Sequence, residues 1–345
     1  MASTLPIIDF GPFIAPDATW QERRNVAAAL DKACREVGFF YLKNHGVPSE
    51  LMNGILDGAR AFFETATRDD KKKIALRRLE EGGDNARGWL EIRSEKGGSH
   101  EAVDMYRPVD LGEPPYTTGQ GPNQWPKSPT SFRPTAEDYI DRVTNLGIQV
   151  MKALAMGLDV DEEIFLSRVN EPFWNLRILG YEGRQNKKES NAGIGQHTGK
   201  TCYIDFGILT FLLTDSTKNS LQVLDKTGEW TWVDPIEGCY VCNIGDMLAE
   251  WTRGVYKSTL HRVCHNNDSL RVSIPFFFDP NWEAYISPVL KASGAEEEDQ
   301  YKGIRYADKF VRSIDVPLWR DPLVSTAKPQ MSSTEQVAGG TPVKA

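Results

Sequence analysis

Residues that carry much of enzyme chemistry are scarce in this chain, which has five cysteines and five histidines among 345 residues. The cysteines are odd in number and scattered, a pattern typical of a reduced intracellular protein and not of a disulfide framework. Cys239 and Cys242 form one Cys-x-x-Cys with no second Cys or His pair beside it, so they are a poor indication of a zinc or redox site.

The chain also lacks an excess of positive charge and long apolar runs. Lys and Arg number 40 against 48 Asp and Glu, a net charge of −8, which argues against nucleic acid or an anionic membrane as the main partner. No apolar run approaches the roughly 20 residues of a membrane-spanning helix, and the Met-Ala-Ser-Thr-Leu-Pro start has no signal-peptide pattern. We therefore predict a cytoplasmic protein with a small-molecule substrate and neither a nucleic-acid nor a membrane partner; the oligomeric state stays open.

Strands and helices alternate in the first part of the chain. Strands are expected at 6–10 and 39–42, where apolar residues cluster. Thr19 followed by Glu22 forms a capping-box pattern that predicts the start of a first helix, and Ser49 is expected to cap a second helix. His45, in an Asn-His-Gly stretch, is assigned a structural role.

The segment 68–134 is polar and rich in Gly and Pro, and long loops of this kind are often functional. Short strands are expected around 87–89 and 104–106, with His100 in a solvated loop between them. A third helix is expected from about 135 to 155, with apolar residues at helical spacing.

From Phe173 onward the sequence consists of short strands separated by turn residues, which predicts an antiparallel double-sheet jelly roll. The expected fold class is therefore α+β, mainly β, with a double-stranded β-helix core and flanking N- and C-terminal helices. We divide the chain into an N-terminal region, 1–130, that packs on a core of 131–315, with a helix near 292–312 and a disordered tail at 325–345. The expected strands are 174–181, 206–213, 221–224, 230–233, 239–244 and 270–278.

Three possible metal ligands occur in the second half of the chain. His197 follows Gly-Ile-Gly-Gln, Asp205 begins Asp-Phe-Gly-Ile-Leu-Thr, and His261 lies in Ser-Thr-Leu-His-Arg-Val. Two imidazoles and one carboxylate are the ligands of a non-haem Fe(II) site with open positions. Arg271 and Ser273 would share one face of a strand, because strand side chains alternate, and an Arg beside a hydroxyl is a suitable anchor for a carboxylate.

With these motifs the chain resembles the Fe(II)/2-oxoglutarate-dependent oxygenases, in the branch with isopenicillin N synthase and the plant flavonoid and gibberellin oxygenases. The resemblance covers roughly residues 5–315. It implies that His197, Asp205 and His261 bind Fe(II), and that O2 is the oxidant.

The same resemblance implies that 2-oxoglutarate is the co-substrate. Arg271 and Ser273 would bind its distal carboxylate, and Tyr181 matches a family tyrosine that reaches the same group. Leu179 stands where the family usually has Asn. No catalytic residue beyond the metal ligands is nominated, since the cofactor carries the chemistry.

The implied activity is hydroxylation, desaturation or cyclisation of a small molecule, and the expected substrate is a secondary metabolite. Two alternatives stay open. One is an oxidase like isopenicillin N synthase that takes its electrons from the substrate and does not use 2-oxoglutarate. The other is a binding module that has lost its metal, since a fold alone does not establish a function.

The spacing of the first two ligands departs from the family pattern, which is His-x-Asp. Position 199 is Gly, and the matching aspartate comes only at Asp205, as if Gly199–Ile204 were inserted. In one interpretation these residues loop outward and Asp205 returns to the metal; in another Asp205 is merely a turn residue. Gly199 could also occupy the ligand position, as in halogenating relatives, or the six residues could be an error in the gene model.

Overall fold

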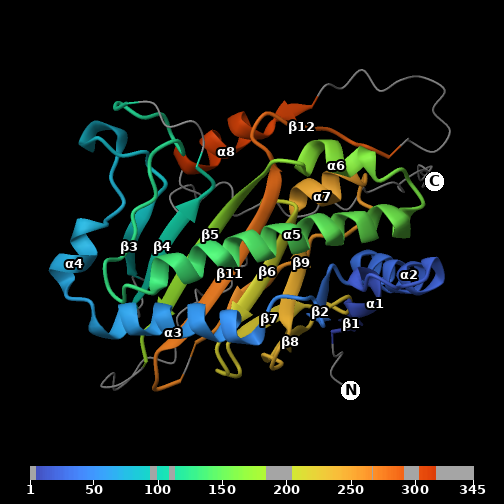
Figure 1. The fold of residues 1–345 in the computed structure, drawn as a ribbon, viewed down its shortest axis with the longest axis horizontal. Helices are drawn as coiled ribbons and strands as arrows, with labels where there is room; N and C mark the ends of the chain where they lie inside the picture. The colour runs from blue at the N-terminus through green and yellow to red at the C-terminus, as the bar shows by residue number, and fades with distance from the viewer. Residues whose placement is uncertain are drawn as a thin grey trace, which may run out of the picture.

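A large β-sheet with helices packed across one of its faces forms the body of the protein (Figure 1). In Figure 1 the helices α3 and α5 cross in front of the strands. The structure is a computed structural model that describes residues 5–93, 99–108, 113–183, 204–265, 267–290 and 303–315.

The large sheet has the strand order β1-β2-β9-β6-β11-β5-β4-β3, in which the β1–β2 pair is parallel and the other neighbours are antiparallel. A smaller antiparallel sheet has the order β10-β7-β8, and β12 pairs with β13. The strands are β1 (Ile7–Asp9), β2 (Phe39–Lys43), β3 (Gly88–Arg93), β4 (Ser99–Tyr106), β5 (Pro172–Tyr181), β6 (Leu209–Thr214), β7 (Leu221–Leu224), β8 (Trp230–Trp232), β9 (Tyr240–Ile244), β10 (His261–Val263), β11 (Arg271–Asn281), β12 (Tyr285–Ile286) and β13 (Ile304–Arg305).

Helices from both halves of the chain cover the sheet. α2 and α3 pack against α5, so the N-terminal region and the core share one hydrophobic interior. The helices are α1 (Gly11–Ile14), α2 (Trp20–Glu36), α3 (Ser49–Thr65), α4 (Arg68–Lys73), α5 (Phe132–Leu158), α6 (Glu163–Val169), α7 (Asp246–Trp251) and α8 (Tyr306–Asp315), with a 3₁₀ turn at Leu79–Glu81. Within the described ranges, none of these helices combines the length and the apolar character needed to cross a membrane.

Alternation along the strands separates two cores. On β2, Phe40 and Leu42 belong to the main core beneath the helices, whereas Phe39 and Tyr41 pack with Leu221 and its neighbours of the small sheet. Successive strand side chains point to opposite faces, so one face of the large sheet is turned to the helices and the other to the small sheet. We call the second face the inner face.

The predicted double-stranded β-helix with flanking helices is confirmed by the observed sheets and by the helices that cover the large one. The capping box is also confirmed, because the Thr19 hydroxyl accepts a hydrogen bond from the Glu22 amide and the Glu22 carboxylate accepts one from the Thr19 amide. The division of the chain at residue 130 stays a prediction.

Three local expectations were wrong. Ser49 is the first residue of α3 and does not cap it, because Pro48 occupies the cap position. His100 is not in a solvated loop but in β4, where its ring stacks on another aromatic ring. The third helix is longer than expected, Phe132–Leu158, because Pro134 is tolerated in the first helical turn and Gly157 in the last one.

The C-terminal expectations are only partly covered by the described residues. Of the helix expected at 292–312, residues 303–312 are described; Ile304–Arg305 form β13 and α8 then runs from Tyr306 to Asp315. The predicted disordered tail at 325–345 lies outside the described residues.

The structural role assigned to His45 has a measurable consequence. Its ring is buried against Tyr240, with Nε2 3.2 Å from the Gly238 carbonyl oxygen and Nδ1 accepting a hydrogen bond from the Val47 amide. Burial lowers the pKa of His45 to about 4, although the contact with Gly238 acts in the opposite direction. The unfolded chain therefore binds a proton between about pH 6.5 and pH 4 that the folded protein excludes.

We expect the free energy of unfolding to fall as the pH is lowered through this window, with a His45 contribution on the order of 3 kcal/mol. Urea unfolding of the wild type and of His45→Asn at pH 7 and pH 4 measures it. The variant should start less stable but lose less stability on acidification. An equal loss in both proteins would contradict a buried, neutral His45.

Candidate active site

Asp205 and His261, which are 56 positions apart in the sequence, meet at the inner face. The Oδ1 atom of Asp205 lies 3.5 Å from Nε2 of His261, and both side chains are largely buried. Two ligand atoms that are each about 2.1 Å from one metal ion, at roughly a right angle, lie about 3 Å apart. The spacing therefore suits two ligands of one metal.

Hydrogen bonds leave one oxygen of Asp205 free for such a role. Its Oδ2 accepts hydrogen bonds from Thr210 Oγ1 at 2.5 Å and from Asn243 Nδ2 at 2.7 Å. Thr210 and Asn243 are register partners on β6 and β9. Outer hydrogen bonds of this kind fix the orientation of a ligating carboxylate.

The backbone of Asp205 is held as firmly as its side chain. Its carbonyl oxygen accepts a hydrogen bond from the Asp246 amide at 2.8 Å, and the Gly207 carbonyl accepts one from Met247 at 3.1 Å. Gly245 permits this approach, because a Cβ there would lie 2.2 Å from the Gly207 carbonyl oxygen. The start of α7 thus fixes Asp205 from the C-terminal side of the predicted insertion.

Asp279 holds the backbone at Gly207 and Ile208, the segment that follows Asp205. Its Oδ1 accepts a hydrogen bond from the Ile208 amide at 3.3 Å and its Oδ2 one from the Tyr306 hydroxyl at 2.9 Å. A Cβ on Gly207 would lie only 1.8 Å from Asp279 Oδ1, so glycine is required there. Burial raises the pKa of Asp279 to about 7.

His261 is oriented by its own strand. Its Nδ1 lies 3.2 Å from the Thr259 carbonyl oxygen, and its ring packs edge-on to Phe39. A proton on Nδ1 would be donated to this carbonyl, which leaves Nε2 with the lone pair that a metal requires.

Arg271 is a buried cation whose hydrogen bonds are incomplete. It is 1% exposed, and Nη2 lies 3.4 Å from Ser273 Oγ. Within the described ranges, Nε and Nη1 have no hydrogen-bond partner. Burial lowers the pKa of Arg271, although the guanidinium stays charged. Buried unpaired donors are costly, so this site is suited to a carboxylate supplied by a ligand.

Tyr181 lies between Arg271 and His100 in a row across three strands. It is the register partner of Arg271 on β11 and of His100 on β4. The Arg271 guanidinium lies 5.0 Å from the centre of the Tyr181 ring, and the His100 ring stacks on it at 5.1 Å. Tyr181 and His100 thus lie in one row with Arg271, and the contact of Tyr181 with the 2-oxoglutarate carboxylate stays a prediction.

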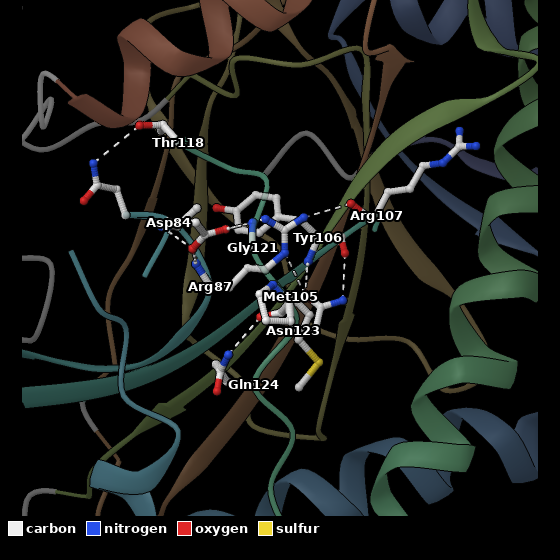
Figure 2. A network of polar contacts seen from close by, with 12 residues as sticks. Asp84, Arg87, Met105, Tyr106, Arg107, Thr118, Gly121, Asn123 and Gln124 are labelled. Atoms are coloured by element: carbon white, nitrogen blue, oxygen red, sulfur yellow. Dashed lines mark hydrogen bonds and ion pairs between the residues drawn. The ribbon is translucent and has the colours of Figure 1, made fainter. Parts of the chain in front are cut away.

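A second buried arginine, Arg87, has its donors satisfied and stabilises the outer end of β4 (Figure 2). It donates to Asp84 Oδ2 at 2.5 Å, to Asn123 Oδ1 at 3.1 Å and to the Arg107 carbonyl at 2.9 Å. Asn123 in turn bonds both the amide and the carbonyl of Tyr106. This network attaches the segment around 121–124 to the end of β4.

Five of the six predicted site residues are described, and they gather at one face in two groups. Asp205 and His261 form one group, and Arg271, Ser273 and Tyr181 the other. His197 lies outside the described residues, so no cluster of three His, Cys, Asp or Glu side chains is present among the residues that are described.

Sequence reasoning missed the residues that hold these groups in place. Asn243 and Thr210 both occurred in recognised motifs, but their hydrogen bonds to Asp205 depend on strand register. Asp279 and His100 had no local signal, since each acts through a residue far away in the sequence.

The fold and this pair of groups define a class: jelly-roll proteins that bind a metal ion beside a carboxylate-bearing ligand. Sequence comparison identifies the family within this class. Residues 5–128 match the family described as non-haem dioxygenase in morphine synthesis N-terminal, and residues 176–280 match the 2OG-Fe(II) oxygenase superfamily.

Individual relatives agree with this match. A homoarginine-6-hydroxylase of Glycine max is 36% identical over 86% of this chain and 92% of its own length, and one of rice is 34% identical over 90% and 96%. A clavatol oxidase of Penicillium crustosum is 32% identical over 86% and 91%. A Neurospora crassa protein crystallised with alpha-KG and 5-formyluracil has a TM-score of 0.72 and 27% identity, over 90% of this chain and 95% of that one.

The chain belongs to the 2OG-Fe(II) oxygenase superfamily. It is a 2-oxoglutarate-dependent dioxygenase, and its cofactors are those of the family: Fe(II), 2-oxoglutarate and O2. The donor set fits them, since Asp205 Oδ1 and His261 Nε2 are spaced for one metal and Arg271 has buried donors without partners among the described residues.

The proximity of Asp205 and His261 predicts a perturbed titration. Burial lowers the pKa of His261, but the adjacent Asp205 carboxylate more than offsets this, so the pKa lies above its ordinary value. In metal-free protein, Asp205→Asn should bring the pKa of His261 down, because burial then dominates. Histidine NMR across pH measures it. Asp225→Asn, which changes a carboxylate in an exposed turn, is the control. If the pKa of His261 were the same in Asp205→Asn as in the wild type, Asp205 could not lie beside His261.

Proposed function

We propose that Asp205 and His261 bind the Fe(II) of this oxygenase, with His197 as the third ligand. The observation that supports this most strongly is the 3.5 Å approach of Asp205 Oδ1 to His261 Nε2, with Oδ2 of Asp205 and Nδ1 of His261 already engaged. Of the interpretations of the insertion, the outward loop agrees best with this position of Asp205. His197 is included as a ligand on the basis of its sequence motif alone.

Arg271, Ser273 and Tyr181 are proposed to bind the distal carboxylate of 2-oxoglutarate. Nε and Nη1 of Arg271, which have no partner in the described part of the chain, provide donors for that group. Tyr181 stacks against the guanidinium and Ser273 lies beside it. Once bound, the iron and 2-oxoglutarate supply the oxidising power for a substrate C–H bond; the protein's part is to orient them and the substrate.

The substrate is proposed to be a small polar molecule, with free amino acids as the first candidates and hydroxylation as the reaction. The support is the identity of 34–36% with relatives named homoarginine-6-hydroxylases. A secondary metabolite is the second candidate, supported by the similarity to a clavatol oxidase.

A cytoplasmic location and the absence of nucleic-acid and membrane partners are retained as part of the proposal. The acidic net charge of −8 supports it. Among the cysteines that the structure describes, Cys34, Cys239 and Cys242 are free thiols, as is usual in a reducing compartment.

Arg271→Lys tests the co-substrate anchor. Lysine keeps the charge but cannot present two parallel donors to a carboxylate, so the Kd for 2-oxoglutarate should rise about 10- to 100-fold, the equivalent of one charge-assisted hydrogen bond. Calorimetry with Mn(II)-loaded protein measures it. Arg262→Lys is the matched control, because Arg262 bonds Gln222 and stacks on Trp230. Equal affinity in wild type and Arg271→Lys would exclude Arg271 as the anchor.

The activity itself is tested by following succinate formation from 2-oxoglutarate with Fe(II), O2 and a set of amino acids and phenolic metabolites. We expect a substrate-stimulated rate that requires both Fe(II) and 2-oxoglutarate, with one hydroxylated product per succinate. Substrate oxidation without 2-oxoglutarate would favour the oxidase alternative. Ligand binding that is independent of metal, with no succinate, would contradict the proposed function.

A further inference from the structure

A charged pair, Asp104 and Arg177, lies on the inner face on β4 and β5, at a level along the strands between the two groups of the active site. On β5, Tyr181 is in register with Arg271. Six residues earlier on the same strand, Asn175 is in register with Phe277 of β11, which pairs with Thr210 of β6. Thr210 is hydrogen-bonded to Asp205. Arg177 falls between Tyr181 and Asn175 on the same face, since strand side chains alternate. Asp104 is its register partner on β4.

Asp104 is buried, and the hydrogen bonds of its carboxylate are incomplete. It is 4% exposed, and its Oδ1 lies 3.6 Å from Nε of Arg177, too far for a hydrogen bond. Among the residues that the structure describes, this oxygen has no hydrogen-bond partner. Burial raises the pKa of the Asp104 carboxyl, because it outweighs the opposing effects of the Arg177 charge and of a hydrogen bond with the Asn175 side chain.

The other buried ion pair of this region shows what a purely structural pair looks like. Asp84, beside Arg87, accepts hydrogen bonds from the amides of Ala86, Arg87 and Gly121, as well as from the guanidinium (Figure 2). Both of its oxygens are therefore satisfied. Asp104 differs because a buried acceptor without a donor costs free energy until a ligand or water supplies one.

We infer that Asp104 and Arg177 form the subsite for the head group of an α-amino-acid substrate with a long side chain. Asp104 Oδ1 accepts a hydrogen bond from the ammonium group, and the Arg177 guanidinium, whose side chain is 31% exposed, pairs with the neighbouring carboxylate. Two opposite charges side by side are complementary to a zwitterion. This inference rests on the proposed function and adds the residues that select the substrate.

The position of Asp104 and Arg177 far from Asp205 is the reason that the substrate is inferred to have a long side chain. β4 is three strand spacings from β6, which is roughly 14 Å across the sheet. Asp205 lies beside β6, because it is hydrogen-bonded to Thr210 of that strand. A head group held at β4 and β5 therefore leaves an extended side chain to reach the iron. The carbon that is oxidised lies far from the head group, and Asp104 acts as a specificity residue.

Calorimetry on the protein loaded with Mn(II) and 2-oxoglutarate tests this without turnover. The probes are L-homoarginine, its Nα-acetyl form and its carboxamide, and the same three forms of the standard amino acids. The variants are Asp104→Asn and Arg177→Gln. Glu91→Gln is the control, because Glu91 is an acid on the neighbouring strand that pairs with Arg68.

Wild type should bind at least one free amino acid about tenfold or more tightly than either blocked form. Asp104→Asn should lose the preference over the Nα-acetyl form and keep that over the carboxamide; Arg177→Gln should do the reverse. Glu91→Gln should behave as wild type. If no amino acid is preferred over its blocked forms, or if Asp104→Asn discriminates as wild type does, the inference is overturned.

Binding of 2-oxoglutarate, measured first in each protein, separates this failure from failure of the proposed function. If wild type binds 2-oxoglutarate but shows no amino-acid preference, only the subsite is wrong. If wild type does not bind 2-oxoglutarate, the proposed function fails and the subsite with it. Should Asp104→Asn not fold, the comparison of free and blocked amino acids in the wild type still decides.

Discussion

The approach of Asp205 to His261 is the contact on which the account of this site depends. It brings together two segments that are separated by β6, β7, β8, β9 and α7, and it is maintained from several directions. Thr210 and Asn243 hold the carboxylate, and the first amides of α7 hold the backbone. A ligand set must be kept within a few tenths of an ångström, and this arrangement provides such constraint on the C-terminal side of the extra residues.

Strand register fixes where the 2-oxoglutarate anchor lies relative to Asp205 and His261. The inner face carries an anchor row of His100, Tyr181 and Arg271 near one end, and the partners Thr210 and Asn243 of Asp205 farther along. A rigid sheet fixes the spacing between these rows. Incomplete hydrogen bonding on this face, at Arg271 and Asp104, contrasts with the satisfied network around Arg87. Among the described residues, the charged side chains with unpaired buried atoms, Arg271 and Asp104, therefore both lie on the face where ligands are expected.

Much of the fold could be predicted from the sequence, because strand alternation, the Thr19–Glu22 capping box and turn residues are local signals. Ordered motifs were enough to nominate His261, Arg271 and Ser273 as site residues, and the structure places all three on the inner face. Sequence alone left Asp205 undecided, because whether a chain returns after six extra residues depends on tertiary contacts such as those with Gly245 and Asp246.

His100 and Ser49 show the limits of local reasoning. The Gly-Gly-Ser sequence before His100 resembles a loop, yet pairing with β3 and β5 extends β4 through it. Ser49 has good capping chemistry, but Pro48 has the extended backbone of the cap position. α3 therefore begins one residue earlier than a Ser49 cap would require, with Ser49 inside the helix. In both places tertiary context or backbone geometry overrides propensity.

The central claim is that Asp205 is an iron ligand despite the extra residues before it. The most direct measurement is the weak visible charge-transfer band of anaerobic Fe(II) with 2-oxoglutarate, recorded for wild type and Asp205→Ala. The account predicts a band in the wild type that is lost or clearly shifted in the variant. A band of unchanged position and strength in Asp205→Ala would show that the metal is bound without Asp205 and would contradict the account.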